Sequence, residues 1–449
     1  MKILILGYPR GWHRYECLST GLKTNGHDVD IVTENFNDIV GPYDRVYTIS
    51  ESLLPIQAKL EKQWGITNVS EKAADILSDK SKMDNWCSNL GFNSIIPHSV
   101  IPTDHTHLDI FENKPFIIKP VIGSGAKPGG LNYLSFKNKK EFLLHLESYV
   151  KFTRSYSSFF KDNKEGKSDG EFNNRKNYYM AQEQLPDDST MWGPYGYVND
   201  KQEFKMLMWV KGELGYNQIS KYAYETKAQS WMSFDAKDVP KDVRETADNF
   251  LKKLITSLNL KNMFFSGPDF YKWGNTIKYI DCNPRLGQGL QQMDDIHRNE
   301  IMSKVLNDES VSFNKQFYWV SSKLKPGTIK YVKDISHLSN FLMKTNNHRD
   351  RLKPGKTIPK FTHVTADKQL RINFLITGAD ENDMKRKFNL VNTSLQNCIE
   401  YVDNKEYLAA MTEYKKDLNY EPDDSGKRRP KVSEYYHRVM VENKKGEPN

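Results

Sequence analysis

Four polar residues near position 280 have the types and the spacing of a site for a divalent cation. Asp269 lies in an apolar run that reads as one strand, which starts at Met263 and continues past Gly267-Pro268. Asp281, Asn283 and Arg285 follow the turn at Gly274-Asn275 at every second position. A turn between two such runs predicts a β-hairpin, which places Asp269 and Asp281 on neighbouring antiparallel strands. Two carboxylates and an amide oxygen suit Mg²⁺ better than zinc. Arg285 would neutralise phosphate charge beside the cation.

The same stretch is also compatible with an ordinary hairpin that carries exposed acids. The elements before and after it must therefore decide whether these residues do chemistry. The chain has 449 residues, enough for two to four domains with sizeable cores. Its net charge of +8 permits nucleotides or nucleic acid as partners but does not require them.

Composition favours a soluble protein of a reducing compartment. Hydrophobic residues make up 38% of the chain, and no apolar run approaches the roughly 20 residues that span a bilayer. The apolar start at residues 3–6 is too short for the core of a signal peptide. The four cysteines show no CxxC pairing and no metal-ligand spacing, so we expect a cytoplasmic protein.

The first 50 residues have the pattern of a parallel α/β sheet. A strand is predicted at Lys2–Leu6, a helix at Arg14–Lys23 and a second strand at Val29–Thr33. The loop after the first strand lies at the edge where open α/β sheets bind ligands. Its side chains either contact substrate or simply pack, and the candidates for substrate contact are Arg10, Trp12 and His13.

A helix start and a glycine-rich loop follow. Ser78-Asp79 has the composition of a helix N-cap and is followed directly by Lys80. Lys119 interrupts the apolar strand 114–120, and the loop 121–130 after it is rich in glycine. Backbone N–H groups of such loops can cradle phosphate oxygens, although many glycine loops are plain turns. The loop is not a Walker A motif, and the polar stretch 151–177 reads as an exposed insertion.

Further elements are predicted from periodicity. The chain has strand patterns at 178–182, 204–210, 328–332 and 370–376, and amphipathic helix patterns at 239–258 and 381–397. The charged segment from Glu421 to Asn449 has no such pattern and is expected to be a partly mobile tail.

Several of these motifs, in the order in which they occur along the chain, resemble those of the ATP-grasp superfamily. The elements are Lys80 at a helix start, Lys119 before a glycine loop, a Glu-x-Leu linker at 183–185 and the Asp281-Cys-Asn-Pro-Arg285 hairpin. The nearest branch contains biotin carboxylase and the carboxylate–amine ligases of purine biosynthesis. The resemblance covers about residues 1–300, and 363–398 resembles the unit that closes the carboxyl-terminal lobe. The sequence departs from many relatives in having Asp where they have Glu as metal ligands.

The resemblance implies a fold of the α/β (α+β) class. A Rossmann-like pre-ATP-grasp domain would occupy residues 1–95. A two-lobed ATP-grasp domain would follow, with a small lobe at 96–190 and a large lobe at 191–310. Residues 311–449 would form a carboxyl-terminal lobe and tail.

The resemblance also implies roles for individual residues. Two catalytic residues are implied, Arg285 and Lys119. Contacts to ATP would come from two lysines, the glycine loop, the linker and an acid for the ribose: Lys80, Lys119, Gly123, Ser124, Gly125, Glu183, Gln184, Leu185 and Asp188, with Asp187 as the alternative acid. The ligands of Mg²⁺ would be Asp269, Asp281 and Asn283. Further substrate contacts are expected from Lys205 and Gln288.

The implied function is that of an ATP-dependent ligase. Such an enzyme activates a substrate carboxylate as an acylphosphate, couples it to an amine or similar nucleophile, and releases ADP and phosphate. Its partners would be ATP, a small carboxylate and an amine, and many relatives are dimers. Three alternatives stay open: a nucleotide-sugar glycosyltransferase, suggested by the segment 26–32, a bicarbonate-dependent carboxylase, and an ATP-binding protein without turnover.

Overall fold

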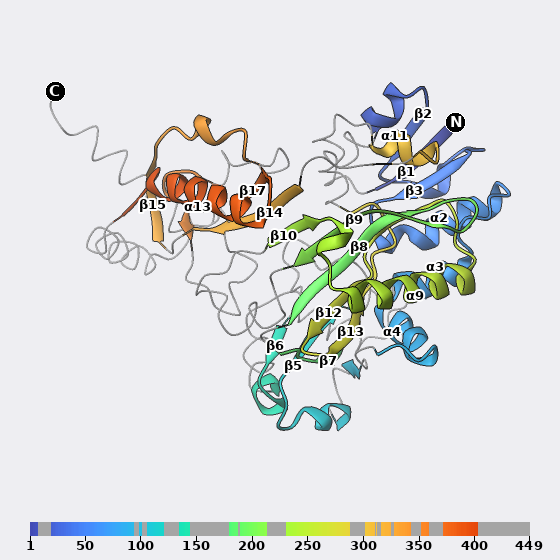
Figure 1. The fold of residues 1–449 in the computed structure, drawn as a ribbon, viewed down its shortest axis with the longest axis horizontal. Helices are drawn as coiled ribbons and strands as arrows, with labels where there is room; N and C mark the ends of the chain where they lie inside the picture. The colour runs from blue at the N-terminus through green and yellow to red at the C-terminus, as the bar shows by residue number, and fades with distance from the viewer. Residues whose placement is uncertain are drawn as a thin grey trace, which may run out of the picture. The chain divides into compact units, whose positions relative to one another are not determined.

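The chain forms two compact units, which are coloured along the sequence in Figure 1. The computed structural model describes residues 1–7, 19–93, 98–100, 106–120, 134–143, 179–186, 189–212, 230–287, 301–309, 311, 316–324, 327–342, 352–358 and 371–402. The first unit consists of residues 1–223 and 229–317, and the second consists of 224–228 and 318–449. No helix in these described segments is long and apolar enough to cross a membrane.

A parallel sheet opens the first unit, as the sequence predicts. Its central strand β1 (Lys2–Leu6) pairs in parallel with β2 (Asp28–Val32) on one side and with β3 (Arg45–Thr48) on the other. The apolar side chains of residues 3–6 in β1 are fully buried. Because the strands are parallel, their carboxyl ends share one edge, where ligands bind in open α/β sheets. Residues that follow β3 directly therefore lie at this edge.

Three helices follow β3, and side-chain caps define where two of them begin. They are α2 (Leu54–Gln63), α3 (Glu71–Ser78) and α4 (Lys80–Asn89). Ser70 Oγ accepts a hydrogen bond from the Ala73 N–H at the start of α3. At the start of α4, Asp79 Oδ1 accepts hydrogen bonds from the N–H groups of Ser81 and Lys82. These bonds satisfy amide donors that have no partner within the helix, so the predicted start of α4 is confirmed.

The first unit also contains an antiparallel sheet in the order β13-β12-β8-β9-β10. Its strands are β8 (Thr190–Val198), β9 (Phe204–Gly212), β10 (Ser230–Phe234), β12 (Asp269–Trp273) and β13 (Thr276–Asp281). Strand β11 (Met263–Ser266) also pairs with β8. We predicted one apolar strand running through β11 and β12. The structure has two, placed one after the other along β8, because Gly267 between them has a φ of +126° that interrupts the strand.

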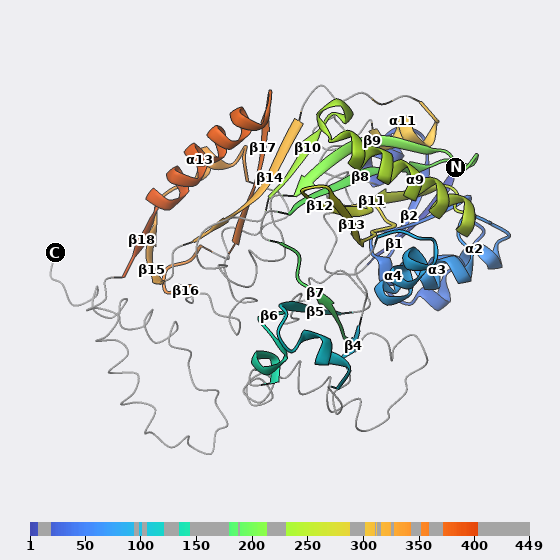
Figure 2. The same cartoon turned by 60° about the horizontal axis from the view of Figure 1, so that its bottom comes forward.

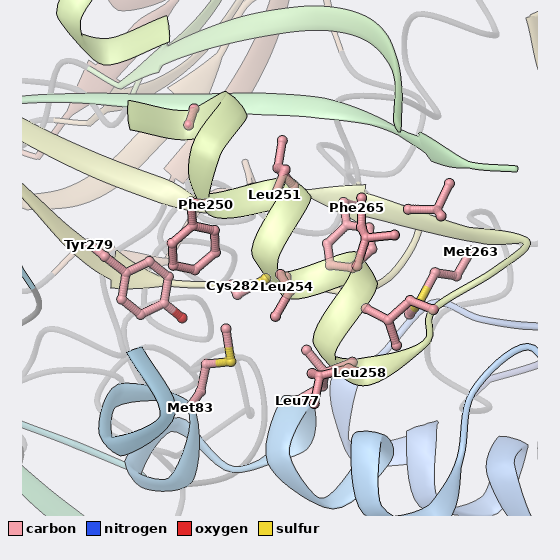
Figure 3. Packing of buried hydrophobic residues seen from close by; sticks show 14 of the residues in the cluster. Leu77, Met83, Phe250, Leu251, Leu254, Leu258, Met263, Phe265, Tyr279 and Cys282 are labelled. Atoms are coloured by element: carbon pink, nitrogen blue, oxygen red, sulfur yellow. The ribbon is translucent and has the colours of Figure 1, made fainter. Parts of the chain in front are cut away.

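Helix α9 (Lys241–Leu258) packs an apolar face into the core of this unit. Buried residues recur at helical spacing, among them Phe250, Leu254 and Leu258. Figure 3 shows these side chains between the strand residues Phe265 and Tyr279 and the helices that carry Leu77 and Met83. The Phe250 and Tyr279 rings stack with centroids 4.9 Å apart. This packing holds α4 against β13, and Leu77 brings α3 into the same cluster.

A smaller antiparallel sheet in the first unit has the strand order β4-β7-β5-β6, visible in Figure 2. The strands are β4 (His98–Val100), β5 (Phe116–Pro120), β6 (Leu134–Phe136) and β7 (Tyr179–Glu183). Phe111 of a 3₁₀ helix (Thr106–Phe111) stacks on Phe116, with ring centroids 4.7 Å apart. A further helix among the described residues of this unit is α11 (Ile301–Leu306).

The described part of the second unit contains strands and a helix. Strand β14 (Gln316–Lys323), in which the boundary between the units falls, neighbours β17 (Arg371–Gly378). The other strands, in the order β16-β15-β18, are β16 (Thr357–Ile358), β15 (Gly327–Val332) and β18 (Ile399–Tyr401). Helix α13 (Glu381–Asn397) packs on β17 through Met384 and Phe388. The predicted strands at 328–332 and 370–376 and the helix at 381–397 are confirmed.

Candidate active site

The hairpin β12–β13 brings two carboxylates together at its open end. Asp269 and Asp281 are direct partners across the two antiparallel strands, so their side chains share one face. A bulge between Asp269 and Phe270 shifts the register immediately after this pair. Bulges of this kind re-aim a side chain and often lie beside functional sites. The predicted pairing of the two acids is confirmed.

Glycine residues make room for the carboxylate of Asp269. A Cβ atom on Gly193 of β8 would lie 2.7 Å from Asp269 Oδ1, and one on Gly267 would lie 3.3 Å from the same oxygen. No side chain larger than hydrogen fits at Gly193 without displacing that oxygen. The space at the end of the hairpin is therefore shaped around the acid.

Asn283 and Arg285 continue the site beyond β13. The Ser266 N–H donates to the Asn283 carbonyl oxygen at 2.9 Å, which ties the segment back to β11. Arg285 Nη2 donates to Asn283 Oδ1 at 3.2 Å. The amide oxygen and the guanidinium predicted from the sequence are thus neighbours in space.

The oxygen donors at this end of the hairpin fit Mg²⁺. The residues that would hold it are Asp269, Asp281 and Asn283, two carboxylates and an amide, which are hard donors. Among the residues that the structure describes, no group of three or more His, Cys, Asp or Glu could hold a metal. The set therefore resembles sites in which one or two carboxylates share Mg²⁺ with substrate phosphates and water, rather than a cage built wholly from protein.

Lys80 reaches this site from helix α4. Its Nζ lies 3.9 Å from Asp281 Oδ1, and the two side chains are only 10% and 18% exposed. The Asp79 cap fixes the first turn of α4 and with it the start of the lysine side chain. The sequence predicted Lys80 as a phosphate contact and Asp281 as a metal ligand, and the structure brings the two together from distant parts of the chain.

Glu51 belongs to the same cluster, and the sequence did not predict it. It begins a short 3₁₀ helix (Glu51–Leu53) just after β3. Arg285 Nε donates to Glu51 Oε1 at 2.7 Å, and the Glu51 side chain is 2% exposed. Burial acts to raise the pKa of this carboxyl, but the charges of Arg285 and Lys80 outweigh it, and the pKa of Glu51 is lowered. The acid is therefore ionised in a buried position.

Sequence signals could have suggested Glu51 only weakly. It follows a parallel strand, at the edge where α/β sheets bind ligands.

Tyr195 of β8 is a second neighbour of the site that the sequence did not single out. Burial, and after it the carboxylate of Asp269, raise the pKa of its phenol, so the hydroxyl keeps its proton at neutral pH.

The linker residues lie beside an apolar cluster between the small sheet and the hairpin. Leu185 is 2% exposed and belongs to a cluster formed with Ile117, Met191, Tyr271 and Ile280. These residues come from β5, β8, β12, β13 and the linker. Elements from both sheets thus meet at one apolar patch.

Three other residues predicted to contact the nucleotide lie in or next to the strands of the small sheet. Glu183 forms an ion pair with Lys278 of β13, and the Gln184 N–H donates to the Pro115 carbonyl at 3.1 Å. Lys119 lies on β5 opposite Met180. The backbone of the linker is therefore fixed by neighbouring strands.

Lys205 lies in a surface ion-pair cluster. Its Nζ is 3.0 Å from Glu203 Oε2 and 3.5 Å from Asp308 Oδ1, and its side chain is 44% exposed. None of the contacts seen among the described residues links it to the hairpin acids. The other predicted site residues lie outside the described residues: Arg10, Trp12, His13, Gly123, Ser124, Gly125, Asp187, Asp188 and Gln288.

No family model matches the sequence, and no curated protein matches it. Solved structures do match the fold. The L-amino acid ligase from Bacillus licheniformis is 12% identical with a TM-score of 0.57, and the match covers 90% of this chain and 99% of that one. The N5-carboxyaminoimidazole synthetase from Staphylococcus aureus complexed with ADP is 11% identical with a TM-score of 0.56, covering 87% and 96%.

A third match is the carboxyaminoimidazole ribonucleotide synthase from Aspergillus clavatus complexed with ATP. It is 12% identical with a TM-score of 0.57, and the match covers 88% of this chain and 98% of that one. At such identities the likeness concerns the fold. The chain has the fold of the ATP-grasp ligases, as the motifs in its sequence implied.

Proposed function

We propose that this chain, which has the ATP-grasp fold, is an ATP-dependent carboxylate–amine ligase. The observation that carries the proposal is the position of Lys80, whose Nζ lies 3.9 Å from Asp281 Oδ1 in the hairpin. A nucleoside triphosphate with its Mg²⁺ needs a cationic side chain for the phosphates and oxygen ligands for the metal, and the two must lie close together. The apolar cluster around Leu185 supports the proposal, because its buried side chains hold the linker beside the hairpin, where the linker backbone would hydrogen-bond the edge of the adenine.

The reaction would have two steps. A carboxylate oxygen of the first substrate attacks the γ-phosphorus of ATP, which gives an acylphosphate and ADP. The amine of the second substrate then attacks the acyl carbon, phosphate leaves, and the amine loses a proton. No group of the enzyme forms a covalent bond in this scheme, so its residues act by positioning reactants and neutralising charge.

Each residue of the cluster has a task in this proposal. Asp269, Asp281 and Asn283 would hold Mg²⁺, which when bound stabilises negative charge on phosphate oxygens. Lys80 would bind a phosphate oxygen from the α4 side. Arg285, in contact with Asn283, would face the acyl group where negative charge develops. Burial acts to lower the pKa of Arg285, but the Glu51 carboxylate raises it, so the guanidinium keeps its charge.

The proposal also includes Lys119, the loop 121–130 and a division into domains, which we predicted from the sequence. Lys119 would contact the phosphates, and the loop 121–130 would close over them and exclude water that hydrolyses an acylphosphate. We also propose the division into a pre-ATP-grasp domain at 1–95, lobes at 96–190 and 191–310, and a carboxyl-terminal lobe at 311–449.

The test is a screen for stimulated ADP release. Purified protein with Mg²⁺ and ATP is given pairs of carboxylates and amines, including amino acids and nucleotide acids, and bicarbonate in a separate arm. We expect one pair to raise ADP release above the ATP-only rate, and Asp281→Ala to abolish the increase while its circular dichroism stays that of the wild type. Asp75→Ala removes an acid that is 56% exposed and serves as the matched control.

Two results would speak against the ligase. ATP that binds without any stimulated ADP release would favour a binding protein without turnover. Stimulation by bicarbonate and an amine alone would favour the carboxylase. Full activity in Asp281→Ala would remove the assignment of that residue.

A further inference from the structure

The buried pair of Glu51 and Arg285 joins two parts of the chain that are 234 positions apart. Glu51 lies at the carboxyl edge of the parallel sheet, and Arg285 lies just beyond the hairpin. Their side chains are 2% and 15% exposed, and the Nε–Oε1 distance is 2.7 Å. A charge-assisted hydrogen bond at this distance and burial fixes the guanidinium far more firmly than an exposed ion pair would.

The local structure around Glu51 is itself fixed by hydrogen bonds. Thr48 Oγ1, at the end of β3, accepts a hydrogen bond from the Ser50 N–H at 3.1 Å and donates to the Ser50 carbonyl at 3.0 Å. The Leu53 N–H donates to the same carbonyl and closes the first turn of the 3₁₀ helix. The carboxylate is therefore held on a short, rigid segment.

Two hydrogen bonds to described residues involve the Nε and Nη2 groups of Arg285. Nε donates to Glu51, and Nη2 donates to Asn283 Oδ1 at 3.2 Å. Neither bond uses Nη1. Two bonds from two different elements determine the plane of the guanidinium, so the direction of Nη1 is determined as well.

We propose that Glu51 is the positioning residue for Arg285 and fixes its guanidinium in the plane in which Nη1 faces the reacting acyl group. Glu51 does not touch substrate in this role; it acts through the arginine. That Arg285 faces an acyl group rests on the proposed function. The fixed orientation of its guanidinium follows from the geometry of the two hydrogen bonds alone. The alternative is that the pair only joins the sheet edge to the hairpin and contributes to stability.

The first test measures orientation without turnover. In protein labelled with ¹⁵N-arginine, the Arg285 Nε–H resonance is identified by its absence in Arg285→Lys. We expect a protected resonance in the wild type and in Glu51→Gln, since a glutamine oxygen can still accept from Nε. In Glu51→Leu we expect the resonance to lose protection from exchange. An unchanged resonance in Glu51→Leu would overturn the proposal.

The second test measures the consequence for catalysis by ADP release. We expect Glu51→Leu to lower kcat about a hundredfold, the scale of losing one aligned charge-stabilising donor, while KM for ATP changes by less than about twofold. Glu51→Gln should keep most of the activity. The double variant Glu51→Leu/Arg285→Leu should be no slower than Arg285→Leu alone, because a positioning residue has no effect without its partner.

Controls separate positioning from stability. Loss of Glu51 leaves the arginine charge buried without this partner and destabilises the single Leu variant. If that variant does not fold, the double variant and Glu51→Gln still give the measurement. Glu61→Gln alters another fully buried acid of the same unit and should change neither the Arg285 resonance nor kcat. Losses in kcat that multiply in the double variant would overturn the proposal. If no substrate pair stimulates the wild type, the proposed function fails, and the resonance alone decides the positioning role.

Discussion

Glu61 gives the most quantitative prediction, because its carboxyl group is fully buried and burial is the largest influence on its pKa. It is 0% exposed and lies on α2. It accepts hydrogen bonds from Gln57 Nε2 at 3.0 Å and from the Val69 N–H at 3.0 Å. Asn68 also donates to it at 3.5 Å, and through Asn262 the network reaches the Tyr197 hydroxyl of β8.

The pKa of Glu61 determines how much this residue contributes to the free energy of unfolding at each pH, and with which sign. Burial raises the pKa of Glu61 from 4.5 to about 7, against the hydrogen bonds from Gln57, Val69 and Asn68, which lower it. A rise of about 2.5 pH units corresponds to about 3 kcal/mol. Since the folded pKa is the higher one, this stability is fully present below pH 4.5 and is lost as pH rises through 7. Above pH 7 the folded protein must hold a negative charge that burial disfavours.

The perturbation is Glu61→Gln, which keeps the size of the side chain and removes the charge. We expect its free energy of unfolding, relative to that of the wild type, to increase by about 3 kcal/mol between pH 4.5 and pH 8, mostly between pH 5 and 7. Urea unfolding followed by tryptophan fluorescence at several pH values measures this difference. Glu71→Gln, which removes an exposed acid paired with Lys62, should follow the wild type. Parallel pH curves for Glu61→Gln and the wild type would contradict a raised pKa for Glu61.

Three further predictions concern the site. Gly193→Ala would place a Cβ atom 2.7 Å from Asp269 Oδ1; we expect a loss of about 1–3 kcal/mol in stability and weaker binding of Mg-ADP by calorimetry. Lys80→Ala should lower the rate of ADP release by about a hundredfold or more and leave the melting temperature within about 2 °C. Burial, and after it the charge of Asp281, raise the pKa of the Cys282 thiol, so iodoacetamide should label it at pH 8 only after urea unfolds the protein.

Each of these variants has a matched control in the chain. Gly65→Ala, at a position with a φ of +74° and no atom within 4 Å of the added Cβ, should lose some stability but bind Mg-ADP as the wild type does. Lys82→Ala removes a lysine from the same helix turn, one that pairs with Asp75 at the surface, and should keep full activity. Equal losses of Mg-ADP binding, or of ADP release, in variant and control would contradict the first two predictions. Fast labelling of native Cys282 in peptide mapping would contradict the third.

The hairpin and the helix starts could be predicted because their signals are local. Gly274-Asn275 lies between two alternating runs, and Asp79 has the side chain that caps a helix, so both features follow from a few neighbouring residues. Strand β8 could not be predicted in this way. Its segment contains Gly193, Pro194 and Gly196, a composition that argues against a central strand. In the folded chain β8 lies between β12 and β9, and Gly193 leaves the room that Asp269 needs.

The candidate site was predictable only in part for a similar reason. Asp269 and Asp281 are related by a hairpin, so their proximity follows from the turn. The contact of Lys80 with Asp281 depends on how α4 packs on the sheet, and only the resemblance to a known family suggested it. Glu51 has no partner nearby in the sequence. Its role depends on Arg285, which the tertiary fold brings to it from the far end of the unit.

The most direct measurement is a crystal structure with Mg²⁺ and the non-hydrolysable analogue AMP-PNP. We expect a metal ion about 2.0–2.1 Å from carboxylate oxygens of Asp269 and Asp281, with Lys80 Nζ on a phosphate oxygen and the adenine beside Leu185. A nucleotide bound elsewhere, or phosphates and metal that touch none of these three polar side chains, would contradict this expectation.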